Sequence, residues 1–118
     1  MFRIFFFIMI GSFLALTCQK NDQGGCFEIS FDERQCQTDE FLAGAETPEE
    51  KAGLAEKYLQ KAGIHVMSRR FDPQYLSIVC EACHVCPTGL RFFFKIGAED
   101  TSKLSGLNVL NPETLACE

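Results

Sequence analysis

Three cysteines and a histidine lie in one short stretch, residues 80–86, which reads Cys-Glu-Ala-Cys-His-Val-Cys. The cysteines recur every third residue, and a Pro-Thr-Gly sequence follows directly. Apolar segments flank the stretch on both sides, so we expect a cysteine-lined turn between two strands. These side chains could form disulfides or hold a soft metal ion. Their pattern does not identify a molecule on which the protein acts.

Metal binding is one use for this set of side chains. Thiolates of Cys80, Cys83 and Cys86 could occupy three corners of a tetrahedral zinc or copper(I) site. His84, Cys36 or His65 would then be the fourth ligand. A closed zinc site usually has two separated Cys-x-x-Cys pairs, however, and the spacing here is incomplete by that standard.

Two further patterns overlap in the same residues. Cys80-Glu-Ala-Cys83-His84 is similar to the haem attachment motif of c-type cytochromes, and the resemblance implies a covalent haem c with His84 as an axial ligand. That motif normally opens a helix, whereas both flanks here are predicted to be strands. Cys80 with Cys83, or Cys83 with Cys86, also has the spacing of a thiol-disulfide exchange pair. Thioredoxin-like pairs lie at a helix N-terminus that lowers the thiol pKa, and no such helix is predicted.

The N-terminal residues 1–17 are predicted to be an export signal. Arg3 supplies a positive charge, and residues 4–10 are an apolar run that is too short for a membrane span of about 20 residues. The run ends in Leu-Ala-Leu-Thr-Cys18, and here the chain resembles bacterial lipoproteins, whose signal is cut before a cysteine that carries diacylglycerol. The resemblance implies that Cys18 is lipidated and that residues 18–25 form a polar tether.

The tether and the stretch 79–89 together resemble small cysteine-rich lipoproteins of the Bacteroidota. This resemblance implies a cell-envelope location, facing the periplasm or the cell surface, and a membrane contact made through the N-terminal lipid. It implies no activity. The formal net charge of the chain is −5, so it has no electrostatic basis for binding nucleic acid.

Export also accounts for the number of cysteines. If Cys18 carries the lipid, six of the seven cysteines remain, and an even set in an exported domain is typical of disulfides. The disulfide candidates are Cys26, Cys36, Cys80, Cys83, Cys86 and Cys117. The sequence does not choose among the ways of pairing them.

Hydrophobic periodicity predicts the elements that hold the cysteine stretch. Strands are predicted over 26–32, 64–67, 75–79 and 90–96. In 90–96, the clearest of them, Phe93 points away from the face that carries the other apolar residues. A helix is predicted over 48–62, because Thr47-Pro-Glu-Glu can form a capping box and Gly63 can end the helix. A short second helix is expected to end near Gly106, and the tail around Pro112 is expected to be a turn.

The predicted order of elements, β-α-β-β-β-α, favours an α+β fold. We expect one domain over 26–118, with two layers in which an antiparallel-rich sheet packs on the main helix. No Ser-His-Asp set, phosphate loop or catalytic carboxylate pair can be recognised, so no catalytic residue is assigned. The sequence therefore predicts an exported, lipid-anchored, non-enzymatic binding or assembly module without a cofactor, which contacts a protein partner in the envelope. A zinc or copper protein is the alternative.

Overall fold

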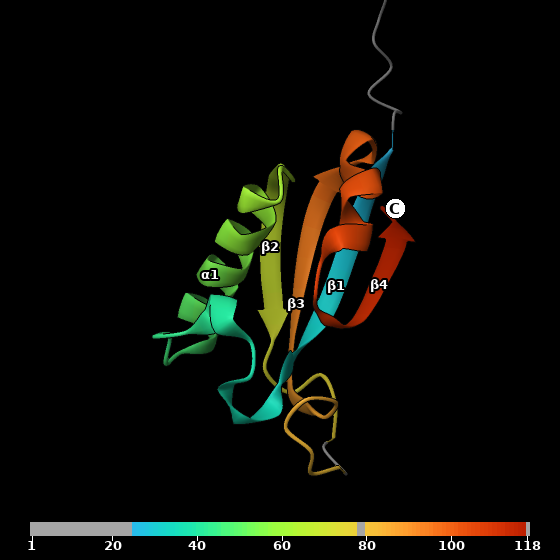
Figure 1. Cartoon of the computed structure of the whole chain (residues 1–118). Coiled ribbons are helices and arrows are strands. Elements are labelled where there is room, and N and C mark those ends of the chain that lie inside the picture. The colour runs from blue at the N-terminus through green and yellow to red at the C-terminus, as the bar shows by residue number, and fades with distance from the viewer. Residues whose placement is uncertain (1–24, 78–79, 118) are drawn as a thin grey trace, which may run out of the picture.

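A four-stranded antiparallel sheet forms the centre of the molecule (Figure 1). The computed structural model describes residues 25–77 and 80–117. Its strands lie in the order β2-β3-β1-β4, and their bounds are β1 (Cys26–Arg34), β2 (Val66–Asp72), β3 (Pro87–Gly97) and β4 (Leu110–Ala116). The helices are α1 (Pro48–Lys61) and the 3-10 helices η1 (Gln35–Gln37), η2 (Glu40–Leu42) and η3 (Ala98–Gly106). The predicted α+β class, with a sheet packed on one main helix, is confirmed.

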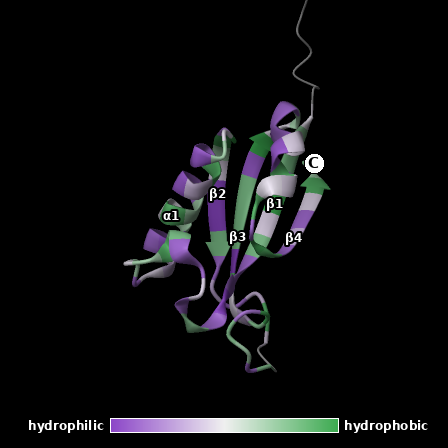
Figure 2. Cartoon of the chain, in the orientation of Figure 1, coloured by the Kyte–Doolittle hydropathy of each residue, from purple (hydrophilic) through white to green (hydrophobic). Residues whose placement is uncertain are grey.

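The two central strands supply most of the core. Ile29 and Phe31 of β1 lie opposite Phe94 and Phe92 of β3, and all four side chains are buried. The rings of Phe31 and Phe94 stack with their centroids 5.7 Å apart. Burial of each such side chain contributes about 1.5–3 kcal/mol, so this row of aromatic residues is a main source of stability. Figure 2 shows the contrast with the edge strand β2, which is mostly hydrophilic.

Helix α1 begins and ends where local chemistry predicts. The Thr47 hydroxyl accepts a hydrogen bond from the backbone N–H of Glu50 at 3.2 Å, and the Glu50 carboxylate accepts from the N–H of Glu46 at 2.9 Å and of Thr47 at 3.4 Å. These two backbone hydrogen bonds hold the pKa of Glu50 below its usual value. Gly63 has a φ of 84° and follows the last turn, as predicted.

Two strand predictions are wrong: the strand expected over 64–67 begins only at Val66 and continues to Asp72, and the strand expected over 75–79 does not form in its described residues. Residues 75–77 of the predicted strand 75–79 form no strand, and residues 78–79 lie outside the described residues. The neighbour of β3 is β2 instead, which begins at Val66 and includes the polar sequence Ser68-Arg69-Arg70. After Val66 this edge strand is largely exposed, so no apolar alternation indicates that it continues to Asp72.

The C-terminal segment was expected to be a turn, and this prediction is also wrong. It forms β4, which pairs with β1 along the sheet edge. Asn111 has a φ of 50° at the place where the register shifts, next to Pro112. Such irregularities are common in edge strands, which explains why turn-forming residues occur within this one.

The second predicted helix is the 3-10 helix η3, which ends at Gly106 as expected and lies on the same face of the sheet as α1. The buried Asp100 joins it to the segment after α1. Its carboxylate accepts hydrogen bonds from Lys103 Nζ at 2.7 Å and from the backbone N–H of His65 at 2.9 Å. Both contacts, that of Lys103 first, hold the pKa of Asp100 below its usual value.

The face of the sheet opposite α1 carries a buried ion pair. Arg91 is 2% exposed, and its Nη1 lies 2.9 Å from Oδ1 of Asp32. Nη2 of Arg91 donates to Ser30 Oγ at 2.9 Å, and Asn111 Nδ2 donates to Asp32 Oδ2 at 3.0 Å. The ring of Tyr75 lies over the guanidinium, with its centroid 5.1 Å from Cζ. Ser30, Asp32 and Arg91 alternate in the sequence with the apolar core residues of β1 and β3. On this face of the sheet they form a second, polar core.

The predicted signal 1–17 and the lipidation candidate Cys18 lie outside the described residues. Within the part of the chain that the structure describes, no helix has both the length and the hydropathy needed to cross a membrane.

Candidate functional site

The cysteine stretch lies at one end of the sheet, and β1 starts at the other end. In Figure 1 β1 begins at the upper end, whereas the connection from β2 to β3 extends below the strands. The nine residues of β1 run from the upper end to the lower one. At about 3.3 Å per residue, this strand separates the two ends by about 30 Å.

All six candidate cysteines are paired in three disulfides, which confirms the prediction of a disulfide framework. Cys80 bonds to Cys86 and closes the cysteine stretch on itself. Cys36 bonds to Cys83 and ties the middle of that stretch to η1. The third disulfide, Cys26–Cys117, joins β1 to the residue that follows β4, at the other end of the sheet. Two of the three disulfides therefore hold one short segment.

Residues 82–86 form a tight turn, which we call the locked turn. The backbone N–H of Cys86 donates to the carbonyl of Ala82 at 3.0 Å, and that of Val85 donates to the same carbonyl at 3.4 Å. Cys86 itself is 4% exposed, but Val85 is 68% exposed and His84 is also exposed at the tip. The turn is thus fixed at its base and open to contact at its tip.

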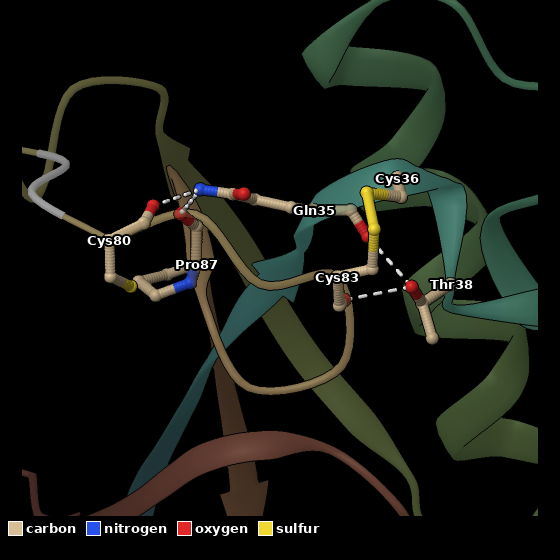
Figure 3. The surroundings of a disulfide bond; sticks show 6 residues. All are labelled: Gln35, Cys36, Thr38, Cys80, Cys83 and Pro87. Atoms are coloured by element: carbon tan, nitrogen blue, oxygen red, sulfur yellow. Dashed lines mark hydrogen bonds between the residues drawn. A yellow bond between two sulfur atoms is a disulfide. The ribbon is translucent and has the colours of Figure 1, made fainter.

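Residues 35–38, which we call the anchor segment, hold the locked turn in place (Figure 3). The side-chain amide of Gln35 donates to the carbonyl of Cys80 at 2.9 Å and to that of Pro87 at 3.2 Å. The backbone N–H of Gln35 donates to the carbonyl of Cys86 at 3.0 Å. Thr38 Oγ1 lies 2.9 Å from the carbonyl of Cys83, beside the disulfide. Hydrogen bonds therefore reinforce both covalent links.

The backbone of the anchor segment is strained. Cys36 has a φ of 62° and Gln37 a φ of 52°, in the left-handed region that residues other than glycine rarely adopt. Each such residue costs about 1–2 kcal/mol, and the conformation persists only where its surroundings determine it. The Cys36–Cys83 disulfide and the contacts of Gln35 and Thr38 are those surroundings. Strain of this kind is concentrated at functional sites such as ligand clamps.

Apolar side chains are exposed at the same end of the molecule. Among the exposed large hydrophobic residues, four lie in the β2–β3 connection or directly before it: Phe71, Tyr75, Leu76 and Val85. Tyr75 is held by its backbone N–H, which donates to the carbonyl of Gly89 at 2.9 Å, and by its ring against Phe93. Exposed apolar groups on a fixed framework are typical of a protein contact surface.

A cavity of about 280 Å³ lies next to the anchor segment, between η2 and the start of α1. Four of the charged side chains that line it, those of Glu33, Arg34, Asp39 and Lys51, already have partners. Glu33 Oε2 lies 2.8 Å from Lys51 Nζ, and its Oε1 accepts from Thr88 at 2.9 Å. Asp39 accepts from Nη1 and from the backbone N–H of Arg34 at 2.7 and 2.9 Å. These pairs fasten the surrounding loops together, so we assign the cavity no ligand.

The metal and haem sites that the sequence offered as alternatives would need free sulfur atoms. In the disulfide form Cys80, Cys83 and Cys86 have no thiolate to offer a metal ion and no thiol that could form a thioether. Across residues 25–77 and 80–117, no three His, Cys, Asp or Glu side chains form a group that could hold a metal ion. His84 lies on the exposed turn. Nor are Cys80 and Cys83, or Cys83 and Cys86, paired with each other, as the alternative of a thiol-disulfide exchange pair would require.

The residues that position the turn carried no signal in the sequence. Gln35 and Thr38 lie in a stretch with no hydrophobic period, and nothing marks the left-handed conformation of Cys36. Comparison of the chain with protein-family models, with curated proteins and with solved structures found no match. The function is therefore inferred from the geometry.

Proposed function

We propose that this chain is an exported, membrane-tethered binding module that presents the locked turn to a partner protein. The observation that carries the proposal is the use of two disulfides and a strained anchor segment to fix a turn whose tip is exposed. A contact residue that is already immobilised loses less entropy on binding, by about 0.5–1.5 kcal/mol per side chain. A rigid protruding tip suits a cleft in a larger protein.

The disulfides also support export. Structural disulfides form and persist in oxidising compartments and are rare in the cytosol of most organisms. Three of them in a small domain are typical of a secreted or envelope protein. With residues 1–17 removed and Cys18 lipidated, the domain would be attached to the membrane by acyl chains, whose burial contributes about 0.8 kcal/mol per methylene group.

The predicted tether joins the domain at the end opposite to the locked turn. The tether would enter the domain at Cys26, whereas the locked turn lies at the far end of β1. A lipid at Cys18 would thus hold one end of the domain near the bilayer and leave the other end directed outward. Val85 and His84 at the tip are the residues that we expect to enter the partner cleft.

The proposal is tested by placing a photo-reactive residue at position 85 in the full chain and irradiating intact cells. We expect one discrete protein adduct from position 85 and none from the matched position Lys57, which is exposed on α1. Fractionation of the same cells should recover the protein in the membrane fraction. The Cys18→Ala variant should release it, because it has no thiol at position 18 to carry the acyl chains.

Equal adducts from positions 85 and 57, or none from position 85, would contradict a specific contact by the locked turn. A Cys18→Ala protein that stays in the membrane fraction would contradict lipidation as the anchor. The two readouts separate the binding role from the tether, so either part of the proposal can fail without the other.

A further inference from the structure

The disulfide Cys36–Cys83 differs from the other two in its exposure. Cys36 is exposed and Cys83 is half-buried, so Cys36 is the most exposed residue of the six disulfide cysteines. Cys86 is 4% exposed, which shields one end of the Cys80–Cys86 disulfide. Both sulfurs of the third disulfide belong to half-buried residues. Access is one of the factors that set the rate of thiol–disulfide exchange, so the exposure of Cys36 favours attack at this disulfide.

The same disulfide is the covalent link between the locked turn and the strained anchor segment. Cys36 and Gln37 hold left-handed conformations that are unfavourable for their residue types. Cutting the disulfide leaves the anchor segment free to relax toward a common backbone conformation. Relaxation at Cys36 would move Thr38 away from the carbonyl of Cys83, because that contact depends on the course of the backbone between them.

We infer that Cys36–Cys83 is a redox-sensitive latch on the locked turn. An external dithiol opens it in two steps. A thiolate of the dithiol attacks Sγ of Cys36, the bond to Cys83 breaks, and Cys83 leaves as a thiolate that takes up a proton. The second thiol of the dithiol then displaces Cys36 from the mixed disulfide. The dithiol becomes a disulfide, and Cys36 and Cys83 together gain two electrons and two protons.

The latch acts only on the turn. Cys80–Cys86 still closes the segment, and Cys26–Cys117 still joins the outer strand to the sheet. The domain therefore stays folded while the tip of the turn becomes mobile. This inference rests on the proposed function for its consequence, because a mobile turn loses the preorganisation that favours partner binding. The chemical behaviour of the latch can be measured without any partner.

The test uses the full-length exported protein in detergent, treated with increasing dithiothreitol and then alkylated. Peptide mapping should find Cys36 and Cys83 modified at reductant concentrations that leave the other four disulfide cysteines intact. Hydrogen exchange of the Val85 and Cys86 amides should then speed up by at least an order of magnitude, while amides of β1 and β3 keep their protection. Earlier opening of either other disulfide would overturn the latch, as would unchanged exchange in the turn.

A double variant, Cys36→Ser with Cys83→Ser, reproduces the open latch without reductant. It should keep the circular dichroism of the folded domain and show fast exchange at Val85. If this variant exchanges as slowly as the parent protein, the disulfide does not control the turn. Photo-crosslinking from position 85 should also fall in this variant. An intact chemical latch together with no adduct in the parent protein would instead indicate that the proposed function is wrong.

Discussion

Replacing Cys26 and Cys117 together with serine is expected to lower the free energy of unfolding by about 4–5 kcal/mol. The two cysteines are separated by 91 residues, so their disulfide closes almost the whole domain into one loop. In the chain-entropy description, the stabilisation by a disulfide increases with the length of the loop that it closes. For a domain of this size, the loss corresponds to a fall of roughly 20–30 °C in melting temperature, measured by calorimetry.

The matched control is the pair Cys80→Ser and Cys86→Ser, which opens a loop with a sequence separation of only 6. The same description gives a loss of about 2 kcal/mol for such a short loop. Denaturant unfolding of both variants without reductant compares the two disulfides directly. A smaller loss from the Cys26 and Cys117 variant than from the control would contradict the role assigned to Cys26–Cys117.

Replacing Arg91 with methionine is expected to cost about 3–5 kcal/mol, because it leaves the buried Asp32 carboxylate without its cation. Asp32 is 2% exposed, and water cannot replace the lost guanidinium. The remaining hydrogen bond to Asp32, from Asn111 at 3.0 Å, is too weak to offset the cost of burying a carboxylate that has no cation beside it. Methionine nearly conserves the volume of the side chain, so the loss reports the charge and not a cavity. Urea unfolding at neutral pH measures it.

Two further variants separate the buried charge from the ion pair itself. Asp32→Asn combined with Arg91→Met removes both charges, and we expect a loss well below the sum of the single losses. Within the described residues Nε of Arg91 has no hydrogen-bond acceptor, so burial of this guanidinium is itself incompletely compensated. Arg69→Met is the surface control, since Arg69 pairs with Glu56 at an exposed site and should lose less than about 1 kcal/mol. Additive losses at positions 32 and 91 would contradict a coupled pair.

Much of the fold follows from local patterns in the sequence. The alternation of the apolar residues Leu90, Phe92, Phe94 and Ile96 with Arg91, Phe93 and Lys95 predicts β3. The capping box at Thr47 predicts the start of α1. Both signals depend on the local environment of the residues that carry them. In β3 this environment is a buried strand face, and in α1 it is an exposed helix end. Only the start of the edge strand β2 was predicted, within 64–67, because the rest of β2 is largely exposed. The edge strand β4 gave no such signal because it too is largely exposed. Their pairing is determined by the neighbouring strand, a contact that is distant in the sequence.

The candidate site could be predicted only in part for a related reason. Spacing identifies the turn that contains Cys83, and parity indicates that its cysteines form disulfides. The partner of Cys83 is Cys36, 47 residues earlier, and only the path of β1 brings the two together. Phe93 was expected to face away from the core, and it does, but its neighbour Tyr75 was expected to lie in a strand. The burial of Arg91 on that second face depends on side chains from other segments of the chain. The alternation within β3 does not indicate which segments cover this face.

The most direct test of the disulfide-locked turn is disulfide mapping of the protein taken from its native envelope. The protein is alkylated before extraction, digested without reductant, and the linked peptides are identified by mass spectrometry. We predict three linked pairs, Cys26 with Cys117, Cys36 with Cys83, and Cys80 with Cys86, and no alkylated thiol among these six residues. Alkylated Cys80, Cys83 and Cys86 in that material would contradict a disulfide-locked turn.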